Sequence, residues 1–273
     1  VDSTLISESA VLHLLNHVSL NIPDNLSFHK IQLNQKTLTL QSSITSLTLT
    51  QELVLDHAES GIMRNQANLV LNGGVKLEEG GSMEIDDPSQ FHVQNILLDG
   101  GHLQVKGSTD VSYSQNTGIS VLSPSTLSLD PDQNLNLKIL SLSSDLQLSF
   151  GSQTSGFKVN RLVLDATAKL SGNETSKLVV SFLDFTKNNT DLIQLENITL
   201  EVEQCLDLEI QQRIILMDGG VLEIGNIQEI TGTQELIGEI LCPITLNQAK
   251  ICINDNVIIR SDLILNGDAE IYI

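Results

Sequence analysis

Apolar and polar residues alternate in short runs along almost the whole chain. Val18-Ser-Leu20, Leu38-Thr-Leu40 and Leu206-Asp-Leu208 are typical of these runs. A period of two with polar intervening residues is the signature of a half-buried β-strand. The runs are separated by Asn, Asp, Gly and Ser, which tolerate tight turns. The pattern predicts an all-β chain of many short strands, and residues 7–15 are the best candidate for one short helix.

A turn phrase recurs within this alternation. It consists of two apolar residues, then Asn or Asp, then usually Gly-Gly, and then another alternating strand. Its five copies place their turn residues at Asn72-Gly73-Gly74, Asp99-Gly100-Gly101, Asp165, Asp218-Gly219-Gly220 and Asn266-Gly267. The gaps of 27, 66, 53 and 48 residues suit one, three, two and two coils of about 22–27 residues each. We interpret these residues as one equivalent corner of a solenoid.

A coil of that length has room for three short strands and three turns. The sequence therefore predicts a right-handed, three-faced parallel β-helix over residues 18–273, preceded by an N-terminal cap or irregular leading segment over residues 1–17. Because residues 269–273 are strand-like, we expect the solenoid to continue beyond this fragment. Two other folds stay open. A leucine-rich repeat shares the Leu-x-x-Leu-x-Leu phrase at residues 137–142, and an antiparallel sandwich fits the density of strands.

Composition narrows the classes of function. Lys and Arg number 14 against 34 Asp and Glu, for a net charge of −20, which repels phosphate backbones and argues against nucleic-acid partners. There is no Trp and there are only two Tyr and six Phe, so little material exists for an aromatic-lined ligand pocket. No apolar run approaches the roughly 18 residues of a membrane-spanning helix.

The sequence contains few candidate catalytic or metal-binding residues. The two acidic clusters in turns are Asp86-Asp87 and Asp130-Pro-Asp132, and neither is accompanied by the Arg or Lys arrangement of a lyase or glycosidase. The six histidines lie in the first 102 residues and form no HExxH motif. We expect no catalytic residue and no cofactor. Calcium at Asp86, Asp87, Asp130 or Asp132 is the alternative, since carboxylates are the hard oxygen ligands it prefers.

Three cysteines, Cys205, Cys242 and Cys252, lie in the last quarter of the chain. The odd number forbids complete pairing within one molecule, and their spacing does not match a metal site. The pattern favours Cys242 as a small buried apolar residue. A bridge between Cys205 and Cys252 stays open.

The phrase Ile96-Leu-Leu-Asp-Gly-Gly-His-Leu-Gln-Val105, in a chain low in aromatic residues and cysteine, resembles bacterial parallel β-helix surface proteins. These are the passenger domains of autotransporters and the filamentous-haemagglutinin-like adhesins. The resemblance implies a secreted or cell-surface stalk or filament segment that is structural or adhesive and not catalytic. Because exposed coil ends must be capped or joined to another segment, we expect neighbouring copies in a homo-oligomer or filament, or a host or cell-surface protein or glycan, as partners. A polysaccharide lyase or hydrolase, or a phage-type receptor-binding spike, is the alternative function.

Overall fold

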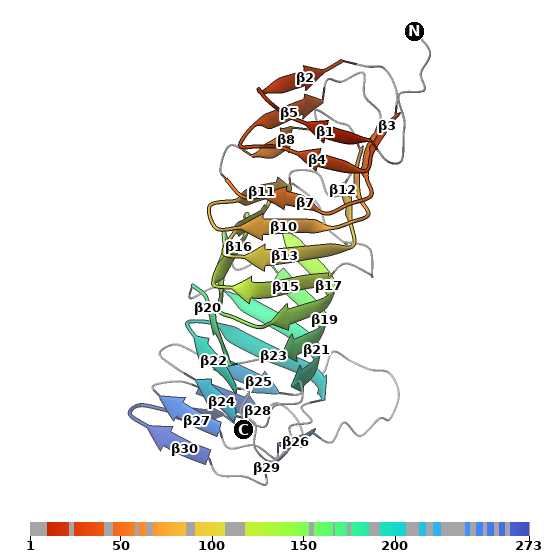
Figure 1. Ribbon diagram of the computed structural model, residues 1–273. Coiled ribbons are helices and arrows are strands. Elements are labelled where there is room, and N and C mark those ends of the chain that lie inside the picture. Colours follow the sequence, from red (N-terminus) through yellow and green to blue (C-terminus); the bar gives the residue numbers. More distant parts are fainter. Residues whose placement is uncertain are drawn as a thin grey trace.

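The chain forms an all-β rod (Figure 1). The computed structural model describes residues 10–21, 25–40, 46–57, 60–63, 68–85, 91–106, 118–152, 156–165, 167–173, 176–185, 192–205, 213–216, 221–224, 238–240, 244–247, 250–253, 257–259 and 263–272. No helix occurs within these ranges, and all pairings between strands are parallel. The predicted parallel solenoid is therefore confirmed, and the leucine-rich repeat and the antiparallel sandwich are excluded.

The strands fall into three stacks that the chain visits in turn. The first stack contains β1 (Val11–His13), β4 (Lys30–Gln32), β7 (Leu53–Leu55), β10 (Val75–Glu78), β13 (Asn95–Asp99), β15 (Gly118–Ser123), β26 (Gly238–Ile240) and β29 (Val257–Ile259). The second contains β2 (Val18–Leu20), β5 (Thr37–Leu40), β8 (Gly61–Met63), β11 (Ser82–Ile85), β14 (His102–Val105), β16 (Ser125–Leu129), β18 (Leu146–Phe150), β20 (Ala168–Ser171), β22 (Leu192–Glu196), β24 (Arg213–Leu216), β27 (Ile244–Asn247) and β30 (Leu263–Asn266). The third contains β3 (Asn25–Phe28), β6 (Ser46–Leu49), β9 (Asn68–Leu71), β12 (Phe91–Val93), β25 (Val221–Ile224), β28 (Lys250–Ile253) and β31 (Glu270–Tyr272).

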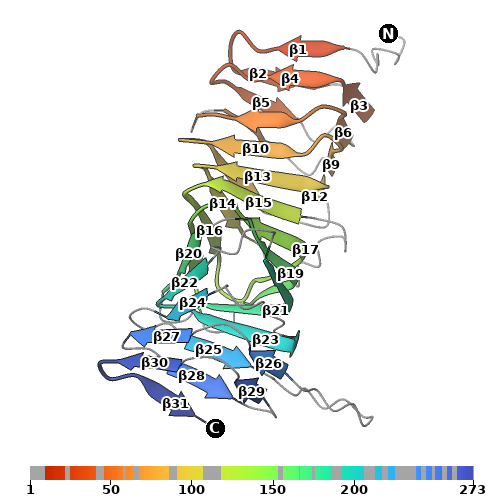
Figure 2. The ribbon, with the colours of Figure 1, turned by 60° about the horizontal axis from the view of Figure 1, so that its bottom comes forward.

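Four long strands run continuously from the third stack into the first and thereby join the two. They are β17 (Asn134–Leu142), β19 (Gly156–Leu164), β21 (Lys177–Phe185) and β23 (Thr199–Cys205). The result is one 11-stranded sheet from β7 to β31, which faces a 9-stranded sheet from β11 to β30. Figure 2 shows the same rod from another side, with β1 and β31 at its opposite ends.

Coil length follows from the register. His102 lies beside Thr126, and Leu140 beside Leu162, so neighbouring coils are offset by 24 and 22 residues. Most offsets are 19 to 24 residues, which overlaps the lower part of the predicted 22–27. The step from Ile214 to Ile244 is longer, at 30 residues.

The core is a set of apolar ladders that run along the rod. One ladder consists of Leu98, Val121, Leu142 and Leu164 on β13, β15, β17 and β19, and all four are fully buried. Each such side chain contributes about 1.5–3 kcal/mol to folding through its burial. Aliphatic ladders of this kind fill the interior with few aromatic residues.

The N-terminal segment differs from the expectation. The candidate helix over residues 7–15 is wrong for the part that the structure describes, because Val11–His13 is strand β1 and pairs with β4. Leu12 stacks on Ile31, which is buried in the core. This tertiary contact overrides the local helical pattern. Strand pairing thus begins upstream of residue 18.

Candidate functional site

The recurring turn phrases occupy three corners of the solenoid and not one. Asn72 lies between β9 and β10, at the corner from the third stack to the first. Asp99 ends β13 and Asp165 follows β19, both at the corner from the first stack to the second. Asn266 ends β30, before the turn to the third stack. Asp218 and its two glycines lie outside the described residues. The interpretation as one equivalent corner therefore does not hold.

Backbone geometry explains why the phrase cannot identify a particular corner. Gly74, Gly100 and Gly267 have φ angles of 84°, 88° and 67°, and each lies at a different corner. All three turns need a residue that adopts the left-handed region without strain, and glycine does so readily. The same turn chemistry is thus required wherever the chain changes stack.

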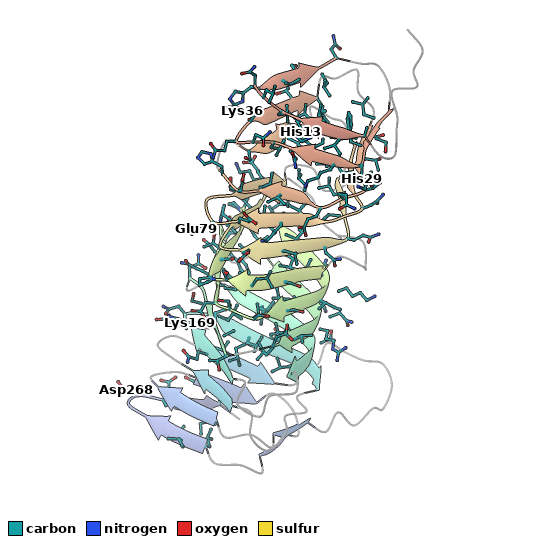
Figure 3. All side chains as sticks on the ribbon, viewed as in Figure 1. His13, His29, Lys36, Glu79, Lys169 and Asp268 are labelled. Atoms are coloured by element: carbon teal, nitrogen blue, oxygen red, sulfur yellow. The ribbon has the colours of Figure 1, made fainter. Side chains whose placement is uncertain are left out.

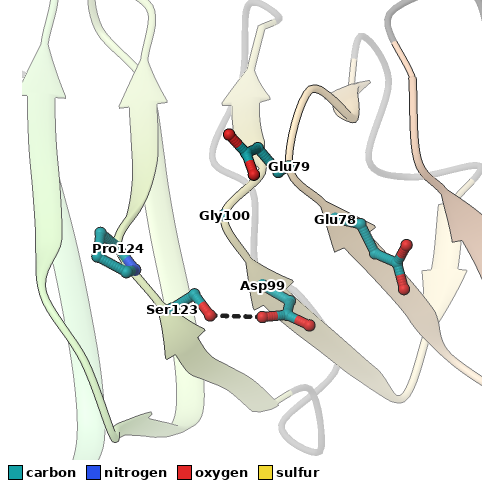
Figure 4. A pocket seen from close by; sticks show the side chains of 6 residues that line it. All are labelled: Glu78, Glu79, Asp99, Gly100, Ser123 and Pro124. Carbon is teal, nitrogen blue, oxygen red and sulfur yellow. Dashed lines mark hydrogen bonds between the residues drawn. The ribbon is translucent and has the colours of Figure 1, made fainter.

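The corner between the first and second stacks carries a ladder of polar side chains. Ser123 Oγ donates a hydrogen bond to Asp99 Oδ1 at 2.5 Å, across neighbouring coils (Figure 4). Further along the same corner, Ser143 Oγ donates to Asp165 Oδ2 at 3.3 Å. Serine hydroxyls of one coil thus donate hydrogen bonds to carboxylates of a neighbouring coil.

This corner also forms a surface cavity of about 650 Å³. Its lining consists of Glu78, Glu79, Asp99, Gly100, Ser123 and Pro124, which Figure 4 shows gathered at the ends of neighbouring strands. From the sequence, Asp99 and Gly100 are predicted only as turn residues. The remaining four belong to the two flanking coils, since Glu78 pairs with Asp99 across 21 residues and Ser123 pairs with it across 24, so they meet only through the register.

Lys76 forms ion pairs with two of the carboxylates that line this cavity. Its Nζ lies 2.8 Å from Glu78 Oε1 and 2.9 Å from Asp99 Oδ2. Hydrogen bonds to Glu78 and then to Asp99 raise the pKa of Lys76 above its usual range. The hydrogen bond from Ser123, followed by that from Lys76, lowers the pKa of Asp99. Asp99 is therefore ionised at neutral pH and bonded to Lys76 and Ser123. These properties suit a structural link between β10 and β13 better than a general acid.

A second cluster lies on the outer face of the second stack. His102 Nδ1 is 2.5 Å from Thr126 Oγ1, and its Nε2 is 3.3 Å from Ser128 Oγ. Burial lowers the pKa of His102. A Ser–His pair is a potential nucleophile and base, but the group on the other ring nitrogen is a hydroxyl and not the carboxylate of a catalytic triad. The cluster therefore links two coils through hydrogen bonds.

The predicted calcium ligands are only partly described. Asp130 Oδ1 accepts a hydrogen bond from Gln104 Nε2 at 2.9 Å. Ser152 Oγ lies 3.5 Å from Asp132 Oδ1. Asp86 and Asp87 lie outside the described residues. Among the residues whose positions are described, no group of three or more His, Cys, Asp or Glu is arranged to hold a metal ion. Calcium at these carboxylates stays a prediction.

The backbone bears on the cysteine bridge that the sequence left open. Cys205 ends β23 and Cys252 lies in β28, and β25 lies between these two strands in the sheet. Two strand spacings amount to about 9.6 Å. Disulfides join Cα atoms less than about 7 Å apart, so these two backbones are too distant for a bridge. Cys242 lies outside the described residues.

Comparison with protein-family models, curated proteins and solved structures finds no match to this chain. The parallel β-solenoid therefore rests on the structure, and the likeness to bacterial adhesins rests on the sequence phrase alone. The described part of the chain holds no helix of the length and apolarity needed to cross a membrane.

Proposed function

We propose that this chain is a non-catalytic structural or adhesive β-solenoid, a stiff stalk or filament segment that acts outside the cell or on its surface. The supporting observation is the unbroken succession of parallel strands in the 11-stranded sheet. At about 4.8 Å per strand, that sheet extends about 50 Å along the rod. A fold that lengthens by one coil at a time, with an unchanged cross-section, is suited to spanning distance.

Stiffness follows from the way neighbouring coils are joined. Backbone hydrogen bonds run between coils on all three faces, and buried apolar ladders fill the space between the faces. Bending the rod would lengthen the hydrogen bonds on one face and crowd the side chains on the opposite face. Side-chain links such as Lys76 to Asp99 add contacts between coils at the corners.

The outer faces supply the contacts that an adhesive role needs. On β14 and β16 the outward side chains are His102, Gln104, Thr126 and Ser128, all polar and partly exposed. Such a flat array offers hydrogen bonds to a protein or glycan partner. The net charge of −20 keeps rods from associating through their sides.

Small-angle X-ray scattering and electron microscopy of the purified chain test the proposed function. The expected result is a rod about 50 Å or more in length, with the narrow cross-section of a single solenoid. A compact particle would contradict the stalk. In parallel, the chain is incubated with acidic and neutral polysaccharides. Glu79 lines the surface cavity. Cleavage of a polysaccharide by the unchanged protein, and its loss in Glu79→Gln, would contradict the structural function and support the lyase or hydrolase alternative.

A further inference from the structure

The middle of the 11-stranded sheet carries a group of exposed basic and amide side chains. The group lies on β17 and β19, two of the long strands that run from the third stack into the first (Figure 1). Because β19 is the sixth of the eleven strands, the group is remote from both ends of the rod. Its members are Asn136, Lys138, Lys158, Asn160 and Arg161, all of them exposed, and we call this group the basic patch.

The register places an amide beside a lysine twice within the basic patch. Asn136 on β17 pairs with Lys158 on β19. Two residues further on, the same register brings Lys138 beside Asn160, and Arg161 follows next along β19. Neighbouring strands are about 4.8 Å apart, and alternate residues of one strand are about 6.6 Å apart. The backbones of Lys138 and Lys158 are therefore about 8 Å apart on a diagonal, and the two amides occupy the other diagonal.

The basic patch is positive on a chain that is acidic as a whole. The chain carries 34 acidic and 14 basic residues, yet neither β17 nor β19 contains Asp or Glu. The sequence from residue 133 to residue 163 has one acidic residue, Asp145, which lies beyond the end of β17 at the corner to the second stack. On the neighbouring strand β21, Asp184 lies two residues past the partner of Arg161. Three cations beside this one carboxylate leave the patch positive.

The number and spacing of these charges decide which anions fit. A duplex nucleic acid carries one charge per about 1.7 Å, and the net charge of −20 repels so dense a polyanion. Anionic membranes attract clusters of about four to eight Lys and Arg, which is more than the patch offers. A linear polysaccharide with carboxylate groups has isolated charges separated by hydroxyl groups. Amides donate to and accept from hydroxyls, and arginine binds a carboxylate through two parallel hydrogen bonds.

We propose that the basic patch binds a linear polysaccharide that carries carboxylate groups. Lys138, Lys158 and Arg161 bind the carboxylates, and the two amides bind neighbouring hydroxyls. Lys158 and Arg161 also interact within the protein, which restricts their side chains and lowers the entropy lost on binding. A long polymer meets the patches of several rods, so weak single contacts add up to stable attachment. This inference rests on the proposed adhesive function and specifies its partner.

Two double variants with the same loss of charge test the binding site. Lys138→Gln with Lys158→Gln changes the patch, and Lys30→Gln with Lys36→Gln changes the first coils. Figure 3 shows Lys36 near the N-terminal end of the rod, away from the middle of the sheet. In titration calorimetry with polygalacturonate, the patch variant should bind about 5- to 30-fold more weakly than the unchanged chain. The N-terminal variant should stay within about 2-fold, because charges far beyond the screening length of about 8–10 Å contribute little.

Further measurements separate specific contacts from general attraction. Asn136→Ala with Asn160→Ala keeps the charge, and the loss of its hydrogen bonds to hydroxyls should weaken binding by about 3- to 10-fold. Salt at 1 M shortens the screening length to about 3 Å and should abolish binding by the unchanged chain. Circular dichroism of each variant verifies that the β-fold is retained.

Several outcomes would overturn the binding site. They are no binding of polygalacturonate by the unchanged chain, equal losses in the patch and N-terminal variants, unaltered binding in the amide variant, or binding that persists in 1 M salt. A preference for dextran sulfate or for vesicles of phosphatidylserine would also overturn it. Scattering from the same samples separates this inference from the proposed function. A rod that does not bind polygalacturonate leaves the stalk intact, whereas a compact particle contradicts the stalk itself.

Discussion

Alanine at Gly81 tests whether neighbouring coils are in backbone contact at the corner between the first and second stacks. A Cβ at this position would lie 1.9 Å from the carbonyl oxygen of Leu55 and 2.7 Å from its carbonyl carbon, one coil away. Ordinary contacts of a Cβ begin at about 3.4 Å. Because the obstructing atoms belong to the backbone, no side-chain rotation can relieve the clash.

The expected loss of stability in Gly81→Ala follows from the separation of neighbouring coils that the added Cβ requires. Overpacking usually destabilises a protein by about 1–3 kcal/mol, and the upper value applies here because the coils themselves must separate. A loss of about 3 kcal/mol corresponds to a fall in Tm of about 6 to 12 °C for a cooperative chain of this size. In a solenoid each coil contacts only its neighbours, so the weakening should be local.

Two neighbouring glycines provide matched controls. Gly61 has nothing within 4 Å of an added Cβ, so Gly61→Ala should change the free energy of unfolding by no more than about 0.5 kcal/mol. An added Cβ at Gly80 would meet only the carbonyl oxygen of Asp56, at an ordinary 4.0 Å, but φ is 82°, so Gly80→Ala should cost about 1–2 kcal/mol through backbone strain alone.

The assay combines thermal unfolding with amide hydrogen exchange. In Gly81→Ala, protection should fall in β7, β10 and β11 and should be preserved in the distant β21. Equal stabilities of the Gly81→Ala and Gly61→Ala variants would refute the close packing of coils at this corner. Loss of protection spread evenly along the rod would refute the local, coil-by-coil account of stability.

Three further predictions concern the core, the acidic corner and the histidine. Leu140→Ala should destabilise the chain by about 2–5 kcal/mol in denaturant unfolding, because Leu140 is fully buried. Its neighbour Ile139 is only partly buried. A similar loss of stability in Ile139→Ala would contradict the assignment of Leu140, and not Ile139, to the inward face. Ser123→Ala should raise the pKa of Asp99 in an NMR titration, because the hydrogen bond from Ser123 is the largest cause of its lowering; an unchanged pKa would reject that cause. The pKa of His102 is lowered from 6.5 in the folded chain, so its contribution to stability is present above pH 6.5 and is lost as the pH falls through the folded value. His102→Gln should therefore flatten the pH dependence of unfolding below pH 6.5, and an unaltered profile would contradict this.

The fold could be predicted from local pattern. Triplets such as Val18-Ser-Leu20 and Leu38-Thr-Leu40 fix which residues face inward, because the side-chain period of a strand is two. The glycine-containing turns show that these strands are short and that the chain bends between them. The predicted coil period of about 22–27 residues then implies stacking, since a single coil cannot cover its own apolar face.

The contacts between coils could not be predicted in this way. Offsets between neighbouring coils range from 19 to 30 residues, and a shift of one residue exchanges the inward and outward faces. The sequence therefore did not indicate that Lys76 meets Asp99, or that His102 meets Thr126 and Ser128.

What the sequence determined by itself is the alternation of strand faces, the turn chemistry and the aliphatic core, because each depends on residues within one strand or turn. What only the tertiary structure decided is the register. It assigned the recurring turn phrase to three corners, made Val11–His13 a strand and brought Lys76 beside Asp99. Register is a property of two coils together, and it depends on the length and path of every turn between them.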